Sequence, residues 1–176
     1  MSLVNLDHPA IDIDLAYATV NNFTDQILYT TPDQCTAKLD KIAAEALYRA
    51  ADMAAGIGLR ILVLDAFRPV SVQEKLWAVR PDPEFVANPA LGSDHSRGTA
   101  IDLTLTTEQG RVLDMGTDFD AALKQSHHGR TDLSPVAQAN RATLLGLMTA
   151  AGFELNWYEW WHYNLPNSSL FPLLEC

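Results

Sequence analysis

The stretch Ser93-Asp94-His95-Ser96-Arg97-Gly98-Thr99-Ala100-Ile101-Asp102 carries a histidine and an aspartate on either side of a glycine. A later stretch, Glu159-Trp160-Trp161-His162, adds a second imidazole and another carboxylate. Together they offer three candidate metal ligands: His95, Asp102 and His162. Three protein ligands leave one tetrahedral position of Zn²⁺ open for water, which is typical of catalytic rather than structural zinc. Glu159 is then a candidate base for that water.

Taken singly, each ligand candidate has an ordinary structural interpretation. A histidine such as His95 or His162 is more often a hydrogen-bonded or packed residue than a ligand, and a lone Asp102 is usually solvated or part of a turn. The spacing favours the metal interpretation, because Gly98 permits a sharp bend that can aim two side chains at one point. Glu159 lies three residues before His162, so a fold that brings one to a metal brings the other near it. The spacing is not that of the helical HExxH motif.

Length and composition predict one globular domain spanning residues 1–176. Apolar residues make up 48% of the chain, which argues against disorder. The net charge of −10 argues against nucleic acid and anionic membranes as partners, because both attract Lys and Arg. No apolar run approaches the roughly 18 residues that a membrane span needs. The composition does not specify an oligomeric state.

The N-terminal residues 1–8 lack a basic segment followed by an apolar one, so no secretory signal is visible. The two cysteines, Cys35 and Cys176, are far apart and lack metal-site spacing. We therefore expect free thiols and a cytoplasmic location.

The first half of the chain contains signals for the start and the end of a helix. Thr31-Pro32-Asp33 predicts a helix start, with Thr31 as N-cap and the proline at the first helical position. An apolar stripe from Leu39 to Ala50 continues the helical period, and Gly56 and Gly58 predict its end. Residues 13–30 are expected to form strand and loop.

The run Ile61-Leu62-Val63-Leu64 predicts a buried strand that Pro69 ends, since proline removes a backbone donor. Residues 71–79 are predicted to be helical, and the proline-rich residues 80–94 to form a loop that leads into the motif.

Residues 100–105 alternate, with Ile101, Leu103 and Leu105 on one side, which predicts a strand whose Asp102 points away from the apolar layer. Ser134-Pro135 predicts another helix, which Gly152 ends. Residues 153–163 are predicted to form a final aromatic-rich strand containing Glu159 and His162. Helices and strands without regular βαβ alternation indicate an α+β fold with a mostly antiparallel sheet flanked by helices.

The chain resembles the D-alanyl-D-alanine dipeptidases of the vancomycin-resistance type, within the zinc D,D-peptidases. The similarity covers nearly the whole chain in the family's order. Its motifs are Asp14-Leu15-Ala16-Tyr17-Ala18-Thr19, Asn22-Phe23-Thr24, Asp65-Ala66-Phe67-Arg68-Pro69, the stretch from Ser93 to Leu105, Met115-Gly116-Thr117-Asp118-Phe119-Asp120, Ser126-His127-His128 and Glu159-Trp160-Trp161-His162-Tyr163. The Glu-Trp-Trp-His form is similar to the dipeptidase branch, whereas carboxypeptidase relatives usually carry Glu-Pro-Trp-His.

The resemblance implies a compact α+β fold shared with the hedgehog signalling domain, and one zinc ion per chain. It implies that the metal ligands are His95, Asp102 and His162. It further implies Glu159 as catalytic base and Arg68 as the residue that stabilises the developing oxyanion. Asp120 would hold the ammonium group of a small dipeptide, and Ser93 and Tyr17 would line the pocket. Without the resemblance, Arg68 is better interpreted as half of a surface ion pair with a neighbour such as Asp65.

These residues predict hydrolysis of D-alanyl-D-alanine to two D-alanines. Two alternatives remain at this point: a zinc D,D-carboxypeptidase acting on peptidoglycan peptides, and a non-catalytic zinc-binding module on the same fold. The resemblance does not assign roles to Arg97, His127 and His128. The two tryptophans, Trp160 and Trp161, are expected to pack around the metal rather than stack on substrate.

Overall fold

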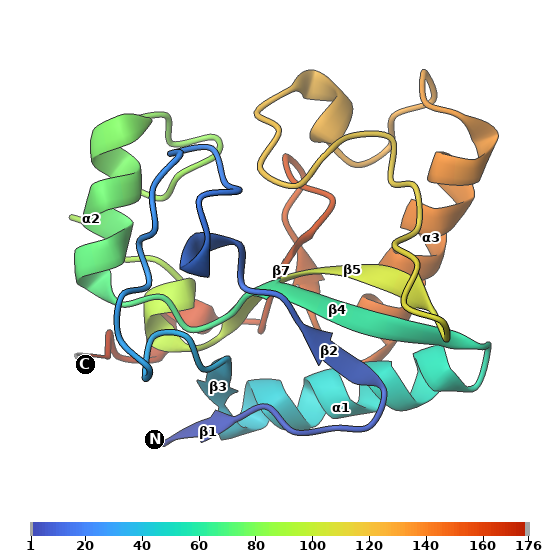
Figure 1. Cartoon of the computed structure of the whole chain (residues 1–176), viewed down its shortest axis with the longest axis horizontal. Coiled ribbons are helices and arrows are strands. Elements are labelled where there is room, and N and C mark those ends of the chain that lie inside the picture. Colours follow the sequence, from blue (N-terminus) through green and yellow to red (C-terminus); the bar gives the residue numbers. More distant parts are fainter. Residues whose placement is uncertain (1, 175–176) are drawn as a thin grey trace.

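A five-stranded mixed sheet forms the centre of the computed structural model, which describes residues 2–174 (Figure 1). The strand order is β2-β4-β5-β7-β6. The bounds are Ile11–Ile13 for β2, Leu59–Asp65 for β4, Ala100–Thr107 for β5, Glu154–Leu155 for β6 and His162–Asn164 for β7. Among the described strands of this sheet, only β2 and β4 pair in parallel; the other pairs are antiparallel. A separate antiparallel ribbon joins β1 (Leu3–Asn5) to β3 (Lys38–Asp40).

Three α-helices of residues 2–174 accompany the sheet: α1 (Lys41–Ala55), α2 (Val70–Val79) and α3 (Pro135–Ala150). Four short 3₁₀ turns complete the described elements: η1 (Ala16–Ala18), η2 (His95–Arg97), η3 (Lys124–Ser126) and η4 (Ser168–Leu170). Helices α1 and α3 contact each other and pack on the sheet, while α2 lies away from α3, at the left of the view in Figure 1. This arrangement confirms the predicted α+β class and the mostly antiparallel sheet.

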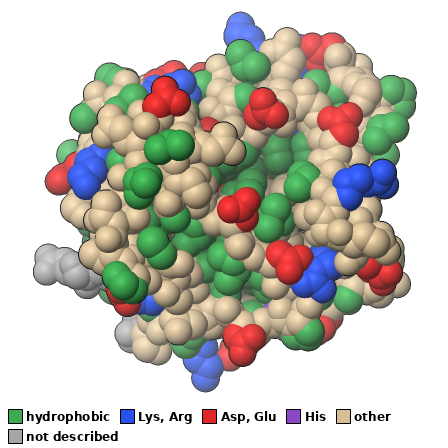
Figure 2. Space-filling view, in the orientation of Figure 1, with side chains coloured by type: hydrophobic (Ala, Val, Ile, Leu, Met, Phe, Trp, Pro, Cys, Tyr) green, Lys and Arg blue, Asp and Glu red, His purple; other side chains and the backbone are tan. Residues whose placement is uncertain are grey.

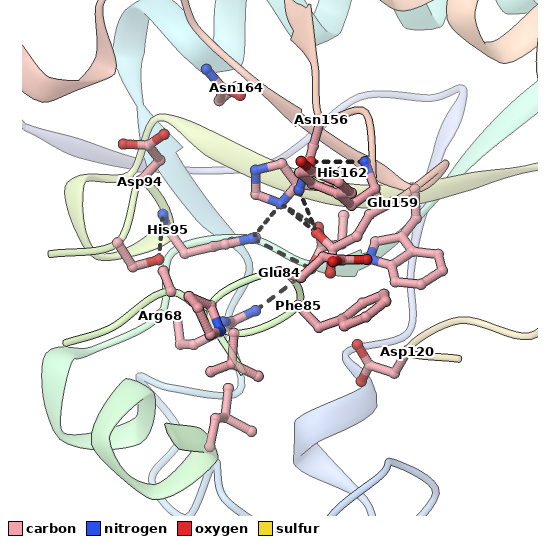
Figure 3. A pocket seen from close by; sticks show the side chains of 18 of the residues that line it. Arg68, Glu84, Phe85, Asp94, His95, Asp120, Asn156, Glu159, His162 and Asn164 are labelled. Atoms are coloured by element: carbon pink, nitrogen blue, oxygen red, sulfur yellow. Dashed lines mark hydrogen bonds and ion pairs between the residues drawn. The ribbon is translucent and has the colours of Figure 1, made fainter. Parts of the chain in front are cut away.

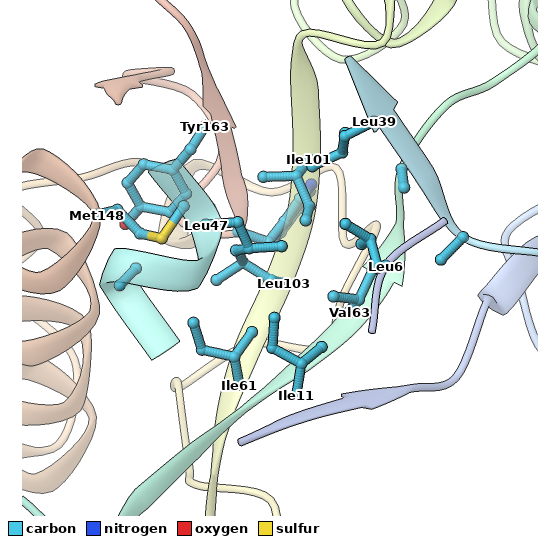
Figure 4. Close-up of a cluster of buried hydrophobic side chains, with 14 of the residues drawn as sticks. Leu6, Ile11, Leu39, Leu47, Ile61, Val63, Ile101, Leu103, Met148 and Tyr163 are labelled. Atoms are coloured by element: carbon cyan, nitrogen blue, oxygen red, sulfur yellow. The ribbon is translucent and has the colours of Figure 1, made fainter. Parts of the chain in front are cut away.

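The core lies between the sheet and the α1–α3 pair (Figure 4). Alternate residues of β4 and β5 face it, and Leu47 of α1 and Met148 of α3 meet them. The core-facing residues of these two strands are fully buried; they are Ile61, Val63, Ile101, Leu103 and Leu105. Each buried side chain of this size stabilises the fold by about 1.5–3 kcal/mol. The alternation predicted for residues 100–105 is therefore confirmed, and it leaves Asp102 on the opposite face of the sheet.

The helix predicted to start at Thr31 begins ten residues later, so that prediction was wrong. Asp40 caps α1, because its side chain accepts a hydrogen bond of 2.9 Å from the Ile42 amide. Thr31 caps only an isolated turn, in which the Gln34 amide donates to the threonine hydroxyl at 3.3 Å. Residues 31–36 form turns, and only Lys38–Asp40 are extended, because β3 pairs with β1; Leu39 is therefore buried in that strand instead of on the helix.

Strand β4 is longer than predicted and contains an irregularity. Val63 pairs with Leu103, but the register then shifts so that Asp65 lies opposite Asp102. In a regular ladder Asp65 would share the core face with Val63, because side chains alternate along a strand. The bulge turns Asp65 onto the other face, beside Asp102.

The single strand predicted for residues 153–163 is also wrong. The chain forms β6, a turn over residues 156–161, and then β7. The Asn156 side chain accepts from the Tyr158 amide at 3.1 Å, and the Asn156 amide donates to the His162 carbonyl at 3.2 Å. Asparagine favours such turns because its side chain competes for nearby amides. Glu159 is therefore a turn residue, whereas His162 starts a strand.

The surface is hollowed near the middle of the view in Figure 2, between loops that stand on the open face of the sheet. Helix α2 starts at Val70, directly after Pro69, as predicted within one residue. None of the helices in residues 2–174 combines the length and the apolar character that a bilayer crossing needs. Cys35 is an exposed free thiol, while the expectation for Cys176 lies outside the described residues.

Candidate active site

All eight residues singled out from the sequence line one cavity of about 530 Å³ on the open face of the sheet (Figure 3). They come from segments that are far apart in the chain. They are Tyr17, Arg68, Ser93, His95, Asp102, Asp120, Glu159 and His162. A cavity of this size is within the range of small-molecule sites.

The three candidate ligands meet at the floor of the cavity. Asp102 of β5 and His162 of β7 are direct partners in the strand register, so their side chains lie on the same face. Asp102 Oδ1 is 3.0 Å from His162 Nδ1, and Asp102 Oδ2 is 3.4 Å from His95 Nε2. His95 Nε2 is 3.2 Å from His162 Nδ1. One donor atom from each residue lies within 4.8 Å of the other two.

The chemistry of this set fits a divalent metal ion. His95 Nδ1 lies 2.7 Å from the Ala66 carbonyl, which can only accept a hydrogen bond, so Nδ1 carries the proton. Its Nε2 lone pair is then free for a metal, an arrangement common around zinc-bound histidines. Burial raises the pKa of the Asp102 carboxyl, but the imidazoles of His95 and His162 outweigh it and hold that pKa below its ordinary value. Two imidazole nitrogens and one carboxylate oxygen are ligands that zinc prefers.

Gly98 makes the approach of His95 possible. It ends η2 in the left-handed region, at a φ of 70°, and reverses the chain between His95 and β5. A Cβ at this position would lie 2.7 Å from Leu3 Cδ2 and 3.0 Å from the Asp40 amide nitrogen. Only glycine satisfies both the conformation and the space. The bend inferred from the sequence is confirmed.

Glu159 lies beside the ligand set, held by the turn that separates β6 from β7. Its Oε2 accepts a hydrogen bond of 2.8 Å from Asn156 Nδ2 and is 3.9 Å from His162 Nδ1. The side chain is 7% exposed. Burial, followed by the negative charge of Asp102, raises the pKa of the Glu159 carboxyl well above its ordinary value. Sequence reasoning missed Asn156, since an asparagine three residues before a glutamate carries no distinctive signal.

Arg68 is buried in the cavity wall, at 6% exposure, and its guanidinium is held from several sides. Asp65 Oδ2 accepts from Arg68 Nε at 2.8 Å and lies 2.6 Å from Nη2. Gln73 Oε1 accepts from Nη1 at 2.8 Å, and Asp102 Oδ2 is 3.5 Å from Nη2. Burial lowers the pKa of Arg68, but Asp65, assisted by Tyr17, Tyr29 and Asp102, outweighs it, so the pKa lies well above its ordinary value. The ion pair with Asp65 therefore exists, but it is not at the surface.

Asp65 is a second residue whose place in the site sequence reasoning missed, since it was considered only as an ion-pair neighbour of Arg68. It is fully buried, and its other oxygen, Oδ1, accepts a hydrogen bond of 2.5 Å from the Tyr29 hydroxyl. The bulge in β4 puts this carboxylate next to Asp102. A buried carboxylate needs hydrogen-bond and charge partners, and Tyr29 and Arg68 together satisfy both oxygens of Asp65.

Tyr17 and Asp120 form the opposite wall of the cavity. The Tyr17 hydroxyl donates to Asp120 Oδ2 at 2.9 Å, and the tyrosine ring lies under the Arg68 guanidinium, 5.1 Å from its centroid. Asp120 has a φ of 59°, which is unusual for a residue other than glycine. Burial and the charge of Asp102 raise the pKa of Asp120 to about 7. Ser93 is buried nearby, where its hydroxyl accepts from the His95 amide at 3.3 Å.

The residues left without a role have structural partners. Arg97 Nη1 donates to the Phe171 carbonyl and so ties η2 to the C-terminal segment. His127 Nε2 lies 3.1 Å from Glu84 Oε1, across the cavity mouth. The His128 amide donates to the Trp157 carbonyl at 3.0 Å. The tryptophans Trp160 and Trp161 are buried, as their expected packing role requires.

The site thus combines two imidazoles and a carboxylate, of which His95 and Asp102 are buried and His162 half-buried, with a further carboxyl and a guanidinium in the same cavity. This is the arrangement expected of a metal-dependent hydrolase. A family model described as D-ala-D-ala dipeptidase, peptidase M15, matches residues 3–172, and the chain belongs to this family. The M15 peptidases are metal-dependent.

Proteins named D-alanyl-D-alanine dipeptidase are similar over most of the chain. The one from Escherichia coli K12 is 42% identical, covering 94% of this chain and 84% of its own. The one from Enterococcus faecium is 32% identical, covering 91% of both chains. The one from Streptomyces coelicolor is 34% identical, covering 86% of this chain and 84% of its own.

Proposed function

We propose that this protein is a zinc-dependent dipeptidase that hydrolyses D-alanyl-D-alanine to two D-alanines. The observation that carries the proposal is the convergence of His95, Asp102 and His162 within 4.8 Å, with Glu159 beside them. Family membership and the names of the relatives support the substrate.

His95, Asp102 and His162 would hold one zinc ion. When bound, zinc supplies Lewis acidity and lowers the pKa of a coordinated water to about 7. The two histidines and the aspartate are positioned before metal binding, because the strand register and the Ala66 carbonyl fix their side chains.

Glu159 would act as general base and then as general acid. Its carboxylate takes a proton from the attacking water and delivers it to the nitrogen of the departing D-alanine. Burial raises the pKa of this carboxyl, which improves its ability to hold the proton between the two transfers. Asn156 holds Oε2, so the carboxyl group keeps its orientation during both transfers.

Arg68 would stabilise the oxyanion that forms when the scissile carbonyl is attacked. Its guanidinium stays charged at any working pH. Asp65 and Gln73 hold three of its N–H groups, which leaves the remaining donors preorganised for the substrate.

Asp120 would bind the free ammonium group of the dipeptide. The Tyr17 hydroxyl would hold the Asp120 carboxylate in place through its hydrogen bond to Oδ2. A site that pairs a buried carboxylate with the substrate amine disfavours an acylated amine, because the carboxylate would lose its partner. Ser93 would contribute to the small pocket around the reacting dipeptide. A cytoplasmic location is part of the proposal, since the exposed thiol of Cys35 suits a reducing compartment.

Metal content and cleavage, measured on one sample, test the proposal. We expect one zinc per chain, release of two D-alanines from D-alanyl-D-alanine, and little cleavage of N-acetyl-D-alanyl-D-alanine. Preference for the acetylated compound would instead indicate a carboxypeptidase. Bound zinc without cleavage of either compound would indicate a non-catalytic module.

Glu159→Gln gives a second test of the same mechanism. The variant should keep its zinc and lose hydrolysis by a factor of about 10²–10⁴, the usual contribution of a general base. Glu154→Gln is the matched control, because Glu154 is exposed on β6. Near wild-type turnover in Glu159→Gln would remove this residue from the mechanism.

A further inference from the structure

The loop between α2 and η2 crosses the active-site cavity as a short strap, here defined as residues 81–91. Five consecutive strap residues, Pro83 to Ala87, line the cavity, and Glu84 and Phe85 are visible in its wall (Figure 3). Two turns give the strap its own shape. Asp82 Oδ1 accepts from the Glu84 amide at 3.1 Å, and Asn88 Oδ1 accepts from the Ala90 amide at 3.0 Å.

One anchor of the strap leads directly to Arg68. The Ala87 carbonyl accepts a hydrogen bond of 2.7 Å from Gln73 Nε2. The other end of the same amide, Gln73 Oε1, accepts from Arg68 Nη1 at 2.8 Å. Gln73 is 1% exposed, so both bonds are shielded from water. A glutamine suits this place because it is both a donor and an acceptor, which neither a carboxylate nor an apolar side chain can be.

The other anchor crosses the cavity mouth to a different part of the molecule. Glu84 Oε1 lies 3.1 Å from His127 Nε2, within ion-pair distance of the imidazole when it is protonated. The His127 ring lies between Phe85 of the strap and Tyr158 of the β6–β7 turn, with centroid distances of 6.3 Å and 5.3 Å. The strap therefore joins α2 to the loops that carry His127 and Tyr158.

We infer that residues 81–91 fix the length of the active-site cavity, with Glu84 as a specificity-determining residue and Gln73 as a positioning residue for Arg68. A peptide longer than two residues would have to displace the strap and break the contact of Glu84 with His127. Displacement would also pull Ala87 from Gln73 and loosen the hold on Arg68. The inference rests on the proposed dipeptidase function, which it deepens by assigning the residues that exclude longer peptides.

Glu84→Gln tests the outer anchor, because it removes the charge and keeps the size. The measured quantity is the ratio of kcat/KM for di-D-alanine to that for tri-D-alanine, in the zinc-loaded protein. We expect the ratio to fall about fivefold, the scale of a partly exposed ion pair. Glu74→Gln is the matched control, since Glu74 is exposed on α2 next to Gln73. An unchanged ratio in Glu84→Gln would overturn the assignment of Glu84.

Gln73→Met tests the inner anchor with a side chain of similar length that makes neither bond. We expect kcat for di-D-alanine to fall about tenfold while KM changes less, since Arg68 acts in the transition state. Hydrogen exchange of residues 83–91 should become faster in both variants. A Gln73→Met protein that is less stable to urea, but has wild-type kcat and wild-type exchange, would show a purely structural role.

Hydrogen exchange separates failure of this inference from failure of the proposed function, because it requires no activity. In one outcome the wild-type protein cleaves di-D-alanine, but neither substitution changes the hydrogen exchange of the strap or the selectivity for the dipeptide. This result would overturn the role inferred for the strap and leave the proposed function standing. A wild-type protein that cleaves neither peptide, together with faster strap exchange in both variants, would overturn the dipeptidase proposal and support the two anchors.

Discussion

Asp102 and His162 face each other across the pairing of β5 with β7, with Asp102 Oδ1 3.0 Å from His162 Nδ1. Two candidate ligands from segments sixty residues apart are thus placed by backbone hydrogen bonds of the sheet rather than by a flexible loop. The third, His95, is oriented by the Ala66 carbonyl. A ligand set carried on rigid elements costs little reorganisation when the metal enters.

His162→Ala should lose stoichiometric metal, because two remaining ligands bind zinc far more weakly than three. Elemental analysis after dialysis should find well below one zinc per chain. His8→Ala is the control, since His8 contacts Asp52 and Tyr48 and lies outside the cavity. One zinc per chain in His162→Ala would exclude this residue as a ligand.

Arg68→Ala should affect both rate and stability. Loss of an oxyanion donor costs about 3 kcal/mol, or roughly a hundredfold in kcat. Removing the guanidinium also leaves Asp65 buried without its cation, which costs about 3–5 kcal/mol of unfolding free energy. Urea unfolding and steady-state kinetics measure the two effects.

Arg60→Ala is the control for the stability effect, because the pair of Arg60 with Asp12 is much more exposed. Its loss should lower the unfolding free energy far less than the loss of Arg68 does, because solvent screens an exposed pair. Equal destabilisation by the two substitutions would contradict the buried role assigned to the pair of Arg68 with Asp65.

Asp120 should make the stability of the metal-free protein depend on pH. Its pKa is raised to about 7 in the folded protein, whereas the unfolded chain has the ordinary value of about 4. Between these values the folded protein keeps a proton that the unfolded chain releases. The resulting stabilisation is complete below about pH 4 and is lost as the pH rises through about 7.

Asp120→Asn cannot titrate, so it should gain stability relative to wild type as the pH rises. We expect a gain on the order of 2 kcal/mol between about pH 4.5 and about pH 8, measured by urea unfolding of both metal-free proteins. A difference in unfolding free energy that does not change with pH would contradict the raised pKa.

Gly98→Ala should destabilise the fold and weaken metal binding, because the added Cβ would collide with Leu3 and the Asp40 backbone. Gly110→Ala is a matched control, since Gly110 also has a positive φ but nothing lies within 4 Å of a Cβ there. The left-handed conformation costs both variants about 1–2 kcal/mol. Crowding should cost Gly98→Ala about 1–3 kcal/mol of unfolding free energy more than Gly110→Ala. Equal unfolding free energies of the two variants would refute the crowding at residue 98.

The convergence of the three candidate ligands and Glu159 was predictable because these residues fall in compact motifs, whereas Arg68, Asp120, Ser93 and Tyr17 were assigned only through the family resemblance. His95, Gly98 and Asp102 stand within eight residues, and Glu159 and His162 within four. The alternation of residues 100–105 also indicated correctly which face of the strand carries Asp102. Local patterns of this kind survive folding, since strand pleat and glycine conformation depend on few neighbours.

The errors arose where distant pairing overrides local preference. Thr31-Pro32-Asp33 has the composition of a helix start, but it forms only a turn, and β1 then pairs with Lys38–Asp40 as a strand, a long-range contact that the local sequence does not reveal. The turn at Asn156 interrupts an aromatic run that has strand propensity. Gln73 and Asp65 could not be recognised as parts of the site, because their roles depend on contacts with Arg68 and on a shift of register.

That register shift has a consequence for how the chain can vary. One additional residue in β4 moves Asp65 from the apolar side of the sheet to the side of Asp102 and Arg68. Substitutions around Leu64 would leave the bulge intact. Deletion of a single residue would instead turn the Asp65 side chain into the hydrophobic core and leave Arg68 without its carboxylate partner. The segment should therefore tolerate substitution far better than a change in length.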